Sequence, residues 1–443
     1  MGKLHGQDSQ RYKQIEILRP EIIKNAFQTS NRLKGIKIFH FGDSHIQGDR
    51  ISGEIRSGLQ KIGGNGGSGL IFPYALCRSV GPLGTTSNIS GSYTWSSILK
   101  NPDHKRIGVM GYEITLQQGA TFSMEFNDEF RGKTSAIFSI IIEGSSDSTS
   151  ILLSIPGKLT QTKWLDKTVV QYTFETPESP KKIVFSTLRE CSLWGIKFEQ
   201  ESGLVYQQCG VVGAQFTHLI PYQTEMVNLL KHDKPDLILF SYGTNESYST
   251  LDSSSYEKKY IQFIQTIQHN LPKTALLITN APDTRSNGKI PKSELIVNRA
   301  LKRVADACAV SYYDLNLAMG GWGSSGVWKA NACFSKDHLH FNKKGGVLIG
   351  QLMEHAILKA CSFDSTLIND LEKKIEANFP LPEKESTNSA INPSQEKINY
   401  YIVQSGDSLT SIAKKLGKTV LELSSLNQLA DPNQIKVGQK IRY

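Results

Sequence analysis

The stretch Ile36-Lys37-Ile38-Phe39-His40-Phe41-Gly42-Asp43-Ser44-His45 decides the fold of this 443-residue chain. Its first six residues have the β-branched and aromatic composition of a strand. After the turn, Ile51, Ile55 and Leu59 recur four residues apart, which is the spacing of one helical face. The order of strand, tight turn and helix places Ser44 beyond the carboxyl end of a strand, where ligands bind in parallel sheets.

The same alternation of strand and helix returns after residue 204. We expect strands at 235–241, 274–279 and 310–313, and helices at 256–270, 295–309 and 346–359. Strands that alternate with helices predict an α/β fold, in which helices cover both faces of a parallel sheet.

Between these parts lies a stretch of different character, from about Gly81 to Glu201. Short β-rich runs are separated there by Gly, Pro, Ser and Asp, and they include 136–143, 150–155, 169–174 and 182–186. Strands at this spacing predict a β-sandwich or small barrel. We therefore expect an inserted all-β domain at 81–203, which divides the α/β domain into residues 1–80 and 204–378.

The C-terminal part begins with a polar stretch at 379–397, rich in Ser, Asn, Glu and Pro, which is the composition of a linker. Residues 398–443 then form a small unit whose apolar pattern predicts the order strand, helix, helix, strand.

Composition narrows the classes of function. The chain is 39% hydrophobic and 21% charged, which is typical of a folded globular protein. No apolar run approaches the roughly 18 residues of a transmembrane helix. The net charge of +9 comes from 50 basic and 41 acidic residues whose lysines are scattered. This charge suits a polyanionic surface such as a cell wall, and we expect no nucleic-acid partner.

Cysteine and histidine spacing gives no sign of a metal or a cofactor. The six cysteines form no CxxC pair, and they fit buried free thiols at least as well as disulfides. The histidines lack the spacing of ligands on a helix, and no phosphate-binding glycine loop of the P-loop type is present.

Four short motifs follow predicted strands or precede the last helix. They are Gly42-Asp43-Ser44-His45, Gly210-Val211-Val212-Gly213-Ala214-Gln215, Phe240-Ser241-Tyr242-Gly243-Thr244-Asn245-Glu246 and Asp337-His338-Leu339-His340. Each alone has a structural explanation: a helix cap, a turn glycine, a loop asparagine and a solvated loop. In this order they resemble the four sequence blocks of the SGNH (GDSL-like) hydrolases, over about 36–80 and 204–359. The resemblance implies a flavodoxin-like parallel sheet between helices.

That resemblance also implies roles for single residues. Ser44 would be the nucleophile, and Asp337 and His340 would complete a catalytic triad. The backbone N–H groups of Ser44 and Gly213 and the amide of Asn245 would form the oxyanion hole. These roles agree with the chemistry, because a serine hydroxyl needs a base, the base needs an orienting carboxylate, and the tetrahedral intermediate needs donors.

Two other histidines compete as the base. His338 and His45 both lie beside triad residues, but the family pattern puts two residues between aspartate and histidine, which favours His340. We expect His45 to line the site or to pack beside it.

The C-terminal unit resembles the LysM module over nearly all of residues 400–443. The matching segments are Tyr400–Leu409, Ile412–Gly417, Leu426-Asn427 and Ile435–Ile441. The resemblance implies binding of N-acetylglucosamine-containing glycans in a groove between two loops. The candidate contacts are Gly406, Asp407, Ser408, Leu409, Asn433 and Ile435, although Ser408 also suits a helix N-cap.

Together the modules resemble the peptidoglycan O-acetylesterases, in which the insertion resembles a carbohydrate-binding module. This implies removal of acetyl from the C6 hydroxyl of N-acetylmuramic acid, with peptidoglycan or another glycan of this kind as partner. Three alternatives stay open: an O-acetyltransferase that uses the same serine, an esterase for another acetylated polysaccharide, and a catalytically silent glycan-binding protein.

The expected location follows from these modules. Met1–Gly6 lack the apolar segment of a secretory signal. Because a LysM module has extracytoplasmic uses, we expect a periplasmic or cell-envelope protein whose native leader has been replaced.

Overall fold

The computed structural model divides the chain into two units, residues 1–382 and 383–443. In the first unit, the structure describes residues 15–29, 35–82, 84–101, 105–127, 137–144, 151–178, 180–200, 202–288, 291 and 293–379. In the second unit, it describes residues 400–416, 423, 427 and 435–442. The linker expected at 379–397 lies outside the described residues, except for Phe379.

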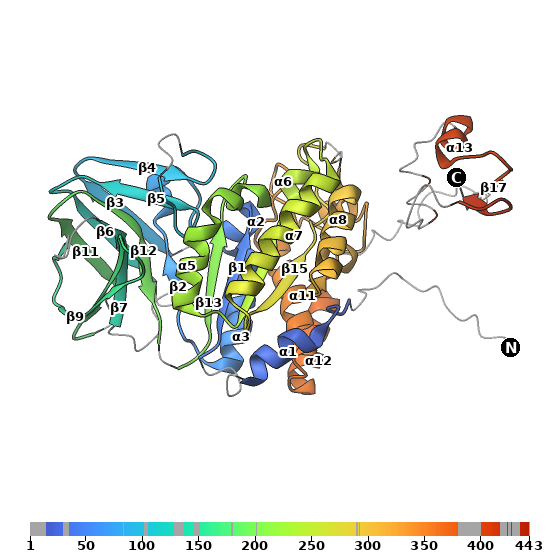
Figure 1. The fold of residues 1–443 in the computed structure, drawn as a ribbon. Coiled ribbons are helices and arrows are strands. Elements are labelled where there is room, and N and C mark those ends of the chain that lie inside the picture. The colour runs from blue at the N-terminus through green and yellow to red at the C-terminus, as the bar shows by residue number, and fades with distance from the viewer. Residues whose placement is uncertain are drawn as a thin grey trace. The chain divides into compact units, whose positions relative to one another are not determined.

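A five-stranded parallel sheet forms the centre of the first unit (Figure 1). Its order is β13 (Val205–Gly210), β1 (Lys37–Gly42), β14 (Leu237–Ser241), β15 (Ala275–Thr279), β16 (Ser311–Tyr313). Numbered by their place in the chain, these strands run 2-1-3-4-5, the flavodoxin-like order. The predicted α/β fold is confirmed. The order reverses beside β1, so a ligand site is expected beyond the ends of β1 and β14.

Helices cover both faces of this sheet because successive strand residues point to opposite sides. Ile38 of β1 packs in one core with α1 (Pro20–Thr29), α3 (Arg50–Gly63) and α11 (Lys343–Ala360). Its neighbour Phe39 packs in the other core with α5 (Gln223–Asp233), α7 (Ser253–Asn270) and α8 (Glu294–Ala307). Helix α12 (Ser365–Asn378) adds to the first core. The remaining short helices include η1 (Tyr74–Cys77), α9 (Leu315–Ala318) and α10 (Ser325–Ala330).

The β region contains two antiparallel sheets. The larger runs β4 (Tyr93–Ser97), β5 (Tyr112–Leu116), β12 (Cys191–Phe198), β7 (Ile137–Glu143), β10 (Val169–Glu175), β9 (Lys158–Trp164). The smaller runs β3 (Thr85–Ser90), β6 (Thr121–Phe126), β11 (Lys182–Thr187), β8 (Ile151–Leu153). The two sheets pack through aromatic rings such as Phe126 and Phe198, whose centroids lie 4.9 Å apart.

One strand of the larger sheet lies earlier in the chain than residue 81, where we expect the insertion to begin. Strand β2 (Gly69–Ile71) pairs with β12 in antiparallel fashion. The chain turns toward this strand through Gly64, Gly67 and Gly69, which have positive φ values of 79°, 99° and 68°. Glycine adopts these angles without steric cost.

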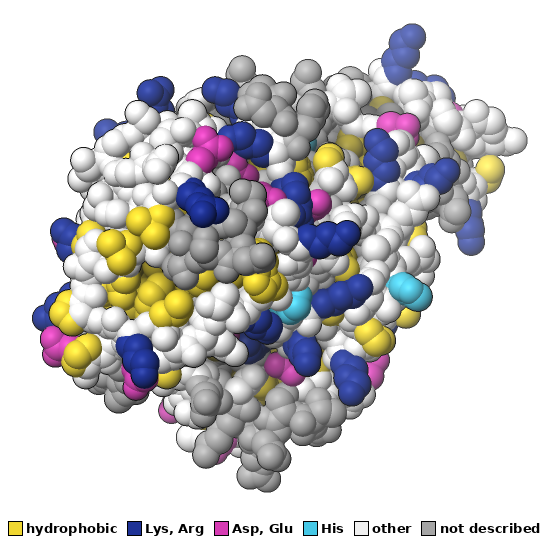
Figure 2. Space-filling view, turned by 60° about the vertical axis from the view of Figure 1, so that its left-hand side comes forward, with side chains coloured by type: hydrophobic (Ala, Val, Ile, Leu, Met, Phe, Trp, Pro, Cys, Tyr) yellow, Lys and Arg dark blue, Asp and Glu magenta, His cyan; other side chains and the backbone are white. Residues whose placement is uncertain are grey.

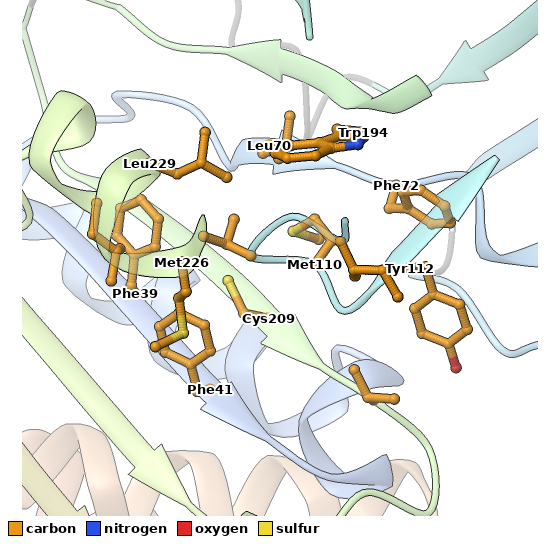
Figure 3. Close-up of a cluster of buried hydrophobic side chains, with 14 of the residues drawn as sticks. Phe39, Phe41, Leu70, Phe72, Met110, Tyr112, Trp194, Cys209, Met226 and Leu229 are labelled. Carbon is orange, nitrogen blue, oxygen red and sulfur yellow. The ribbon is translucent and has the colours of Figure 1, made fainter. Parts of the chain in front are cut away.

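The β region and the parallel sheet share one apolar core (Figure 3). Met110 and Trp194 of the β region belong to the same buried cluster as Phe39, Cys209 and Met226 of the α/β part. Salt bridges add to this contact, because Arg106 reaches Glu225 of α5 and Lys197 pairs with Asp233 at the end of that helix.

The second unit has a small core of its own. Strand β17 (Tyr400–Ile402) pairs antiparallel with β18 (Lys440–Arg442), and helix α13 (Leu409–Lys415) follows β17. Val403, Leu409, Ile412, Ala413, Leu423 and Ile441 are buried together. These elements agree with the predicted outer strands and first helix, whereas most of the expected second helix lies outside the described residues.

All six cysteines are unpaired, in agreement with the expectation of free thiols and not with that of disulfides. None of the helices in the described ranges has the length and apolarity needed to cross a membrane. On the face drawn in Figure 2, Lys and Arg side chains are spread over much of the surface.

Candidate active site

The turn after β1 positions Ser44. A side chain at Gly42 would collide with Ile46 and would lie 2.9 Å from the carbonyl oxygen of Ser241. The buried carboxylate of Asp43 accepts from the backbone N–H of His45 and caps the short helix α2 (Ser44–Gln47). Asp43 therefore takes the capping role, and the Ser44 hydroxyl is available to another partner.

That partner is His340. Its Nε2 lies 2.8 Å from Ser44 Oγ, and its Nδ1 lies 2.6 Å from Asp337 Oδ2. Hydroxyl, imidazole and carboxylate thus touch in series, although 296 positions separate Ser44 from His340. The structure brings together the three residues predicted as the triad, and His340 rather than His338 contacts the serine.

The carboxylate of Asp337 is held in its ionised form. Burial opposes ionisation, but the side chain of His340 and the backbone N–H groups of Leu339 and His340 donate hydrogen bonds that lower the pKa of Asp337. The two backbone donors lie 3.1 Å from Asp337 Oδ1. This orientation leaves Oδ2 facing the imidazole, so Nδ1 carries the proton and Nε2 can accept the serine proton.

His45 connects the two halves of the site. Its Nδ1 lies 3.0 Å from Asp43 Oδ1, and its Nε2 lies 3.0 Å from the carbonyl oxygen of Leu339. Both partners only accept, so both ring nitrogens donate and the ring is an imidazolium. Burial alone would lower the pKa of His45, but the charge and hydrogen bond of Asp43 raise it above its ordinary value. The ring is buried, as expected of a packing residue, and its centroid lies 5.6 Å from that of His340.

The expected oxyanion donors lie on loops that follow β13 and β14. Gly213 has a φ of 78°, which favours glycine, and it is exposed. Asn245, in the short helix α6 (Thr244–Ser247), donates one amide proton to the carbonyl oxygen of Ala214 at 2.9 Å. An amide NH₂ has a second proton to offer. Within the described ranges, the N–H groups of Ser44 and Gly213 donate to no protein acceptor.

Gln47, which sequence reasoning did not single out, holds the loops around the site. Its side chain is fully buried. Its Nε2 donates to Ser79 Oγ at 2.7 Å and to the Val80 carbonyl at 2.6 Å, while its Oε1 accepts from the Val212 N–H at 2.6 Å. The amide of Val212 is thus used within the fold, whereas the next amide, that of Gly213, donates to no protein acceptor among the described residues.

Glu246 was also missed as a site residue, although it directly follows Asn245. Its buried carboxylate accepts from the N–H groups of Phe216, at the start of η2 (Phe216–Tyr222), and of Gly243, at 2.8 and 3.1 Å. Glu246 therefore joins the loops that carry Gly213 and Asn245. Burial raises its pKa to about 7.

A cavity of about 190 Å³ opens beside Ser44 and His340. Ile51, Val80, Val212 and Phe341 supply its apolar lining, and Arg50 lies in the same wall. Gly213 and Asn245 do not line this cavity, although Val212 next to Gly213 does. Among the described residues, no group of three His, Cys, Asp or Glu side chains is placed to hold a metal.

The C-terminal candidates have structural partners. Asp407 accepts from Tyr401 Oη at 2.8 Å and from Lys415 Nζ at 3.0 Å, and Ser408 caps α13 in a reciprocal pair with Ser411. The side chain of Leu409 is buried in the core of the module, so only its backbone can face a glycan. Gly406 has a φ of 88°, Ile435 packs beside the core, and Asn433 lies outside the described residues.

A parallel sheet of order 2-1-3-4-5 with these strand-end residues is the SGNH-hydrolase class of fold. Residues 38–353 match the profile of the GDSL-like lipase/acylhydrolase family. The chain belongs to this family. Residues 401–442 match the LysM domain.

Similar proteins include one solved structure, which shares the fold, and two curated proteins that match shorter stretches of the sequence. A solved structure described as "Peptidoglycan O-acetylesterase in action, 5 min" has a TM-score of 0.62 and 22% identity, covering 80% of this chain and 96% of that one. The N-acetylmuramoyl-L-alanine amidase XlyA of Bacillus subtilis (strain 168) is 54% identical over 39 residues, 9% of this chain and 13% of the amidase. An endolysin of Bacillus phage PZA is 30% identical over 156 residues, 33% of this chain and 53% of the endolysin. The chain thus spans about half or less of these curated relatives.

Proposed function

We propose that this protein removes O-acetyl groups from peptidoglycan, at the C6 hydroxyl of N-acetylmuramic acid, through an acyl-enzyme on Ser44. The observation that carries the proposal is the contact series Ser44–His340–Asp337. The similarity in fold to a protein described as a peptidoglycan O-acetylesterase supports the choice of substrate. A LysM module on the same chain supports it independently.

Acylation begins with attack on the ester carbonyl. His340 takes the proton of the Ser44 hydroxyl through Nε2, and the oxygen of Ser44 bonds to the acetyl carbon. Asp337 keeps the imidazole oriented and stabilises the imidazolium. His340 then protonates the departing sugar oxygen, which leaves acetyl on Ser44.

Deacylation repeats these steps with water. His340 removes a proton from water, the hydroxide attacks the acetyl carbon, and acetate leaves as Ser44 regains its proton. In both steps, the oxyanion accepts hydrogen bonds from the N–H groups of Ser44 and Gly213 and from the second amide proton of Asn245. Each such donor typically contributes about 2.7–4 kcal/mol to the lowering of the barrier.

The C-terminal module serves as a tether in this proposal. Binding of residues 398–443 to a glycan strand raises the concentration of the esterase at neighbouring acetyl groups without any new contact in the site. This arrangement requires a location in the cell envelope, where the glycan lies, and it makes peptidoglycan the binding partner as well as the substrate.

The deciding experiment measures acetate release. The full chain and Ser44→Ala are incubated with O-acetylated peptidoglycan, with acetylated xylan and with a small aryl acetate. We expect Ser44-dependent acetate release that is fastest from peptidoglycan. Preference for xylan would assign another polysaccharide, and transfer of acetyl to a glycan acceptor without net acetate would assign an acetyltransferase. Either result would overturn the proposal.

A further inference from the structure

We propose that Arg50 forms an anion subsite in the active-site cavity and binds a carboxylate on the alcohol half of the ester. This inference rests on the proposed function, because it names the chemical feature by which a muramic-acid ester differs from other sugar acetates. It makes Arg50 a residue that determines specificity, and it assigns no bond-making step to Arg50.

The cavity lining contains cationic side chains and no carboxylate. Arg50 and His45 line the same cavity as Ser44 and His340, and no aspartate or glutamate belongs to that lining. His45 is neutralised by Asp43, which lies 3.0 Å away. The guanidinium of Arg50 is therefore the lining cation whose charge is left for a ligand.

The neighbouring acid does not neutralise Arg50 either. Asp49 directly precedes it, but the carboxylate of Asp49 forms a bidentate pair with the buried Arg56, at 3.0 and 2.7 Å. Among the described residues, Arg50 has no acidic partner within ion-pair distance. The buried Arg56 thus binds the carboxylate of Asp49, which is therefore not available to the exposed Arg50.

The guanidinium is held in place while most of its donors stay available. Arg50 Nη1 donates to the carbonyl oxygen of Phe341 at 2.9 Å, and the residue is exposed. Arginine has five N–H donors in a planar fork that fits both oxygens of a carboxylate. With one donor fixed on the residue that follows His340, the others keep a defined position relative to the base.

The remaining wall suits the neutral part of such a substrate. Val80 and Val212 are exposed apolar side chains, and the buried Ile51 belongs to the same lining. An acetyl methyl or a sugar ring face can pack on these side chains, while a carboxylate turns toward Arg50. In peptidoglycan, the carboxylate can belong to the lactyl ether of muramic acid or to the attached peptide. In either case, the group that Arg50 binds is a carboxylate.

The test compares Arg50→Gln and Arg50→Lys with the parent protein, with Arg189→Gln as the control. Arg189 is an exposed arginine between β11 and β12 that does not line the cavity. One substrate pair is phenyl acetate and 3-carboxyphenyl acetate. A second set is O-acetylated muramic-acid glycan with a free lactyl group, the same glycan carrying peptides, and neutral 6-O-acetyl chito-oligosaccharide.

We expect Arg50→Gln to lower kcat/KM about 10-fold or more on carboxylate-bearing esters, with a change within about 2-fold on neutral ones. On carboxylate-bearing esters, the kcat/KM of Arg50→Lys should lie between those of the parent and of Arg50→Gln. Arg189→Gln should match the parent on every ester. The parent's preference for the carboxylate should weaken as salt is added. If Arg50→Gln loses more activity on the glycan with a free lactyl group, Arg50 binds the lactyl carboxylate. If it loses more on the glycan that carries peptides, Arg50 binds a peptide carboxylate.

Two results would overturn the inference. An equal loss on neutral and anionic esters would mean that Arg50 acts only through the loop of Phe341, and no loss on any ester would mean that Arg50 binds nothing. If acetylated glycans are not substrates but the effect on the aryl acetate pair persists, the proposed function fails and the anion subsite stands.

Discussion

His45 Nε2 lies 3.0 Å from the carbonyl oxygen of Leu339, so the residue after the serine is joined to the residue before the histidine of the triad. The ring also contacts Asp43, which caps the helix that begins at Ser44. One charged side chain thus fixes the distance between two segments that lie almost 300 positions apart.

Replacement of His45 should therefore disturb the triad without removing any of its members. Glutamine can donate to one acceptor but cannot bridge both, so we expect His45→Gln to lower kcat/KM by about 10- to 100-fold on a small aryl acetate. His269→Gln, at the exposed end of α7, is the matched control. Parent-like activity in His45→Gln would show that the bridge does not position the base.

Asp337→Asn should keep the shape of the site but lose the orienting carboxylate. We expect kcat to fall on the order of 10³- to 10⁴-fold, because an amide no longer fixes the reactive tautomer of His340. Stopped-time assays of acetate release, corrected for the activity of Ser44→Ala, measure the residual rate. A fall of less than about 10-fold would remove Asp337 from the catalytic mechanism.

Asn245→Ala tests the oxyanion hole. The loss of one donor should lower kcat by about 10²- to 10³-fold and leave KM little changed, since the donor acts on the tetrahedral intermediate. Asn270→Ala, which removes a similar side-chain bond to the carbonyl of Thr266 in α7, serves as the control. If KM rises while kcat stays constant, Asn245 binds the substrate and does not stabilise the oxyanion.

Glu246 should make stability depend on pH. Its pKa of about 7 in the folded protein lies above the ordinary 4.5, so its contribution to the free energy of unfolding is complete below 4.5 and is lost as pH rises through about 7. The loss is on the order of 3 kcal/mol. Glu246→Gln cannot ionise, so the parent should lose stability relative to it as the pH rises from 4.5 to about 7. Parallel denaturation midpoints across this range would contradict the shifted pKa.

Removal of residues 383–443 separates the two units. The small unit has its own core, so we expect the truncated chain to hydrolyse a soluble acetyl ester at the parent rate while binding less to isolated peptidoglycan sacculi. Sedimentation with sacculi measures the binding. Loss of soluble-ester turnover on truncation would contradict a purely tethering role.

Much of the α/β core could be predicted from the sequence because its signals are local. A strand buried on both faces reads as an apolar run, as at 235–241, and helix α7 repeats its apolar residues at the helical period. The triad could be located because its spacing matched family motifs, and the structure then brought Ser44 to His340. The family itself is confirmed by the match over residues 38–353.

What escaped prediction depends on contacts between distant segments. The bonds from Gln47 to Val80 and Val212 leave no periodic signal, because a lone glutamine after a motif resembles any surface residue. The pairing of β2 with β12, about 125 positions later, is set by side chains that meet only after folding. One available signal was the spacing of Asp49 and Arg56. Asp49 is the N-cap residue of α3 and Arg56 lies about two helical turns further along, so their side chains can meet on one side of the helix.

The interior that the β region shares with the parallel sheet has a consequence for protein engineering. Met110 and Trp194 of the β region belong to the same hydrophobic core as Phe39 and Cys209 of the α/β part. Exchanging the β region for that of a homologue would therefore disrupt the packing of this core. A chimaera would have to exchange the contacting core side chains of both parts together. The second unit has its own core, so it could be transferred to another protein by dividing the chain between the two units.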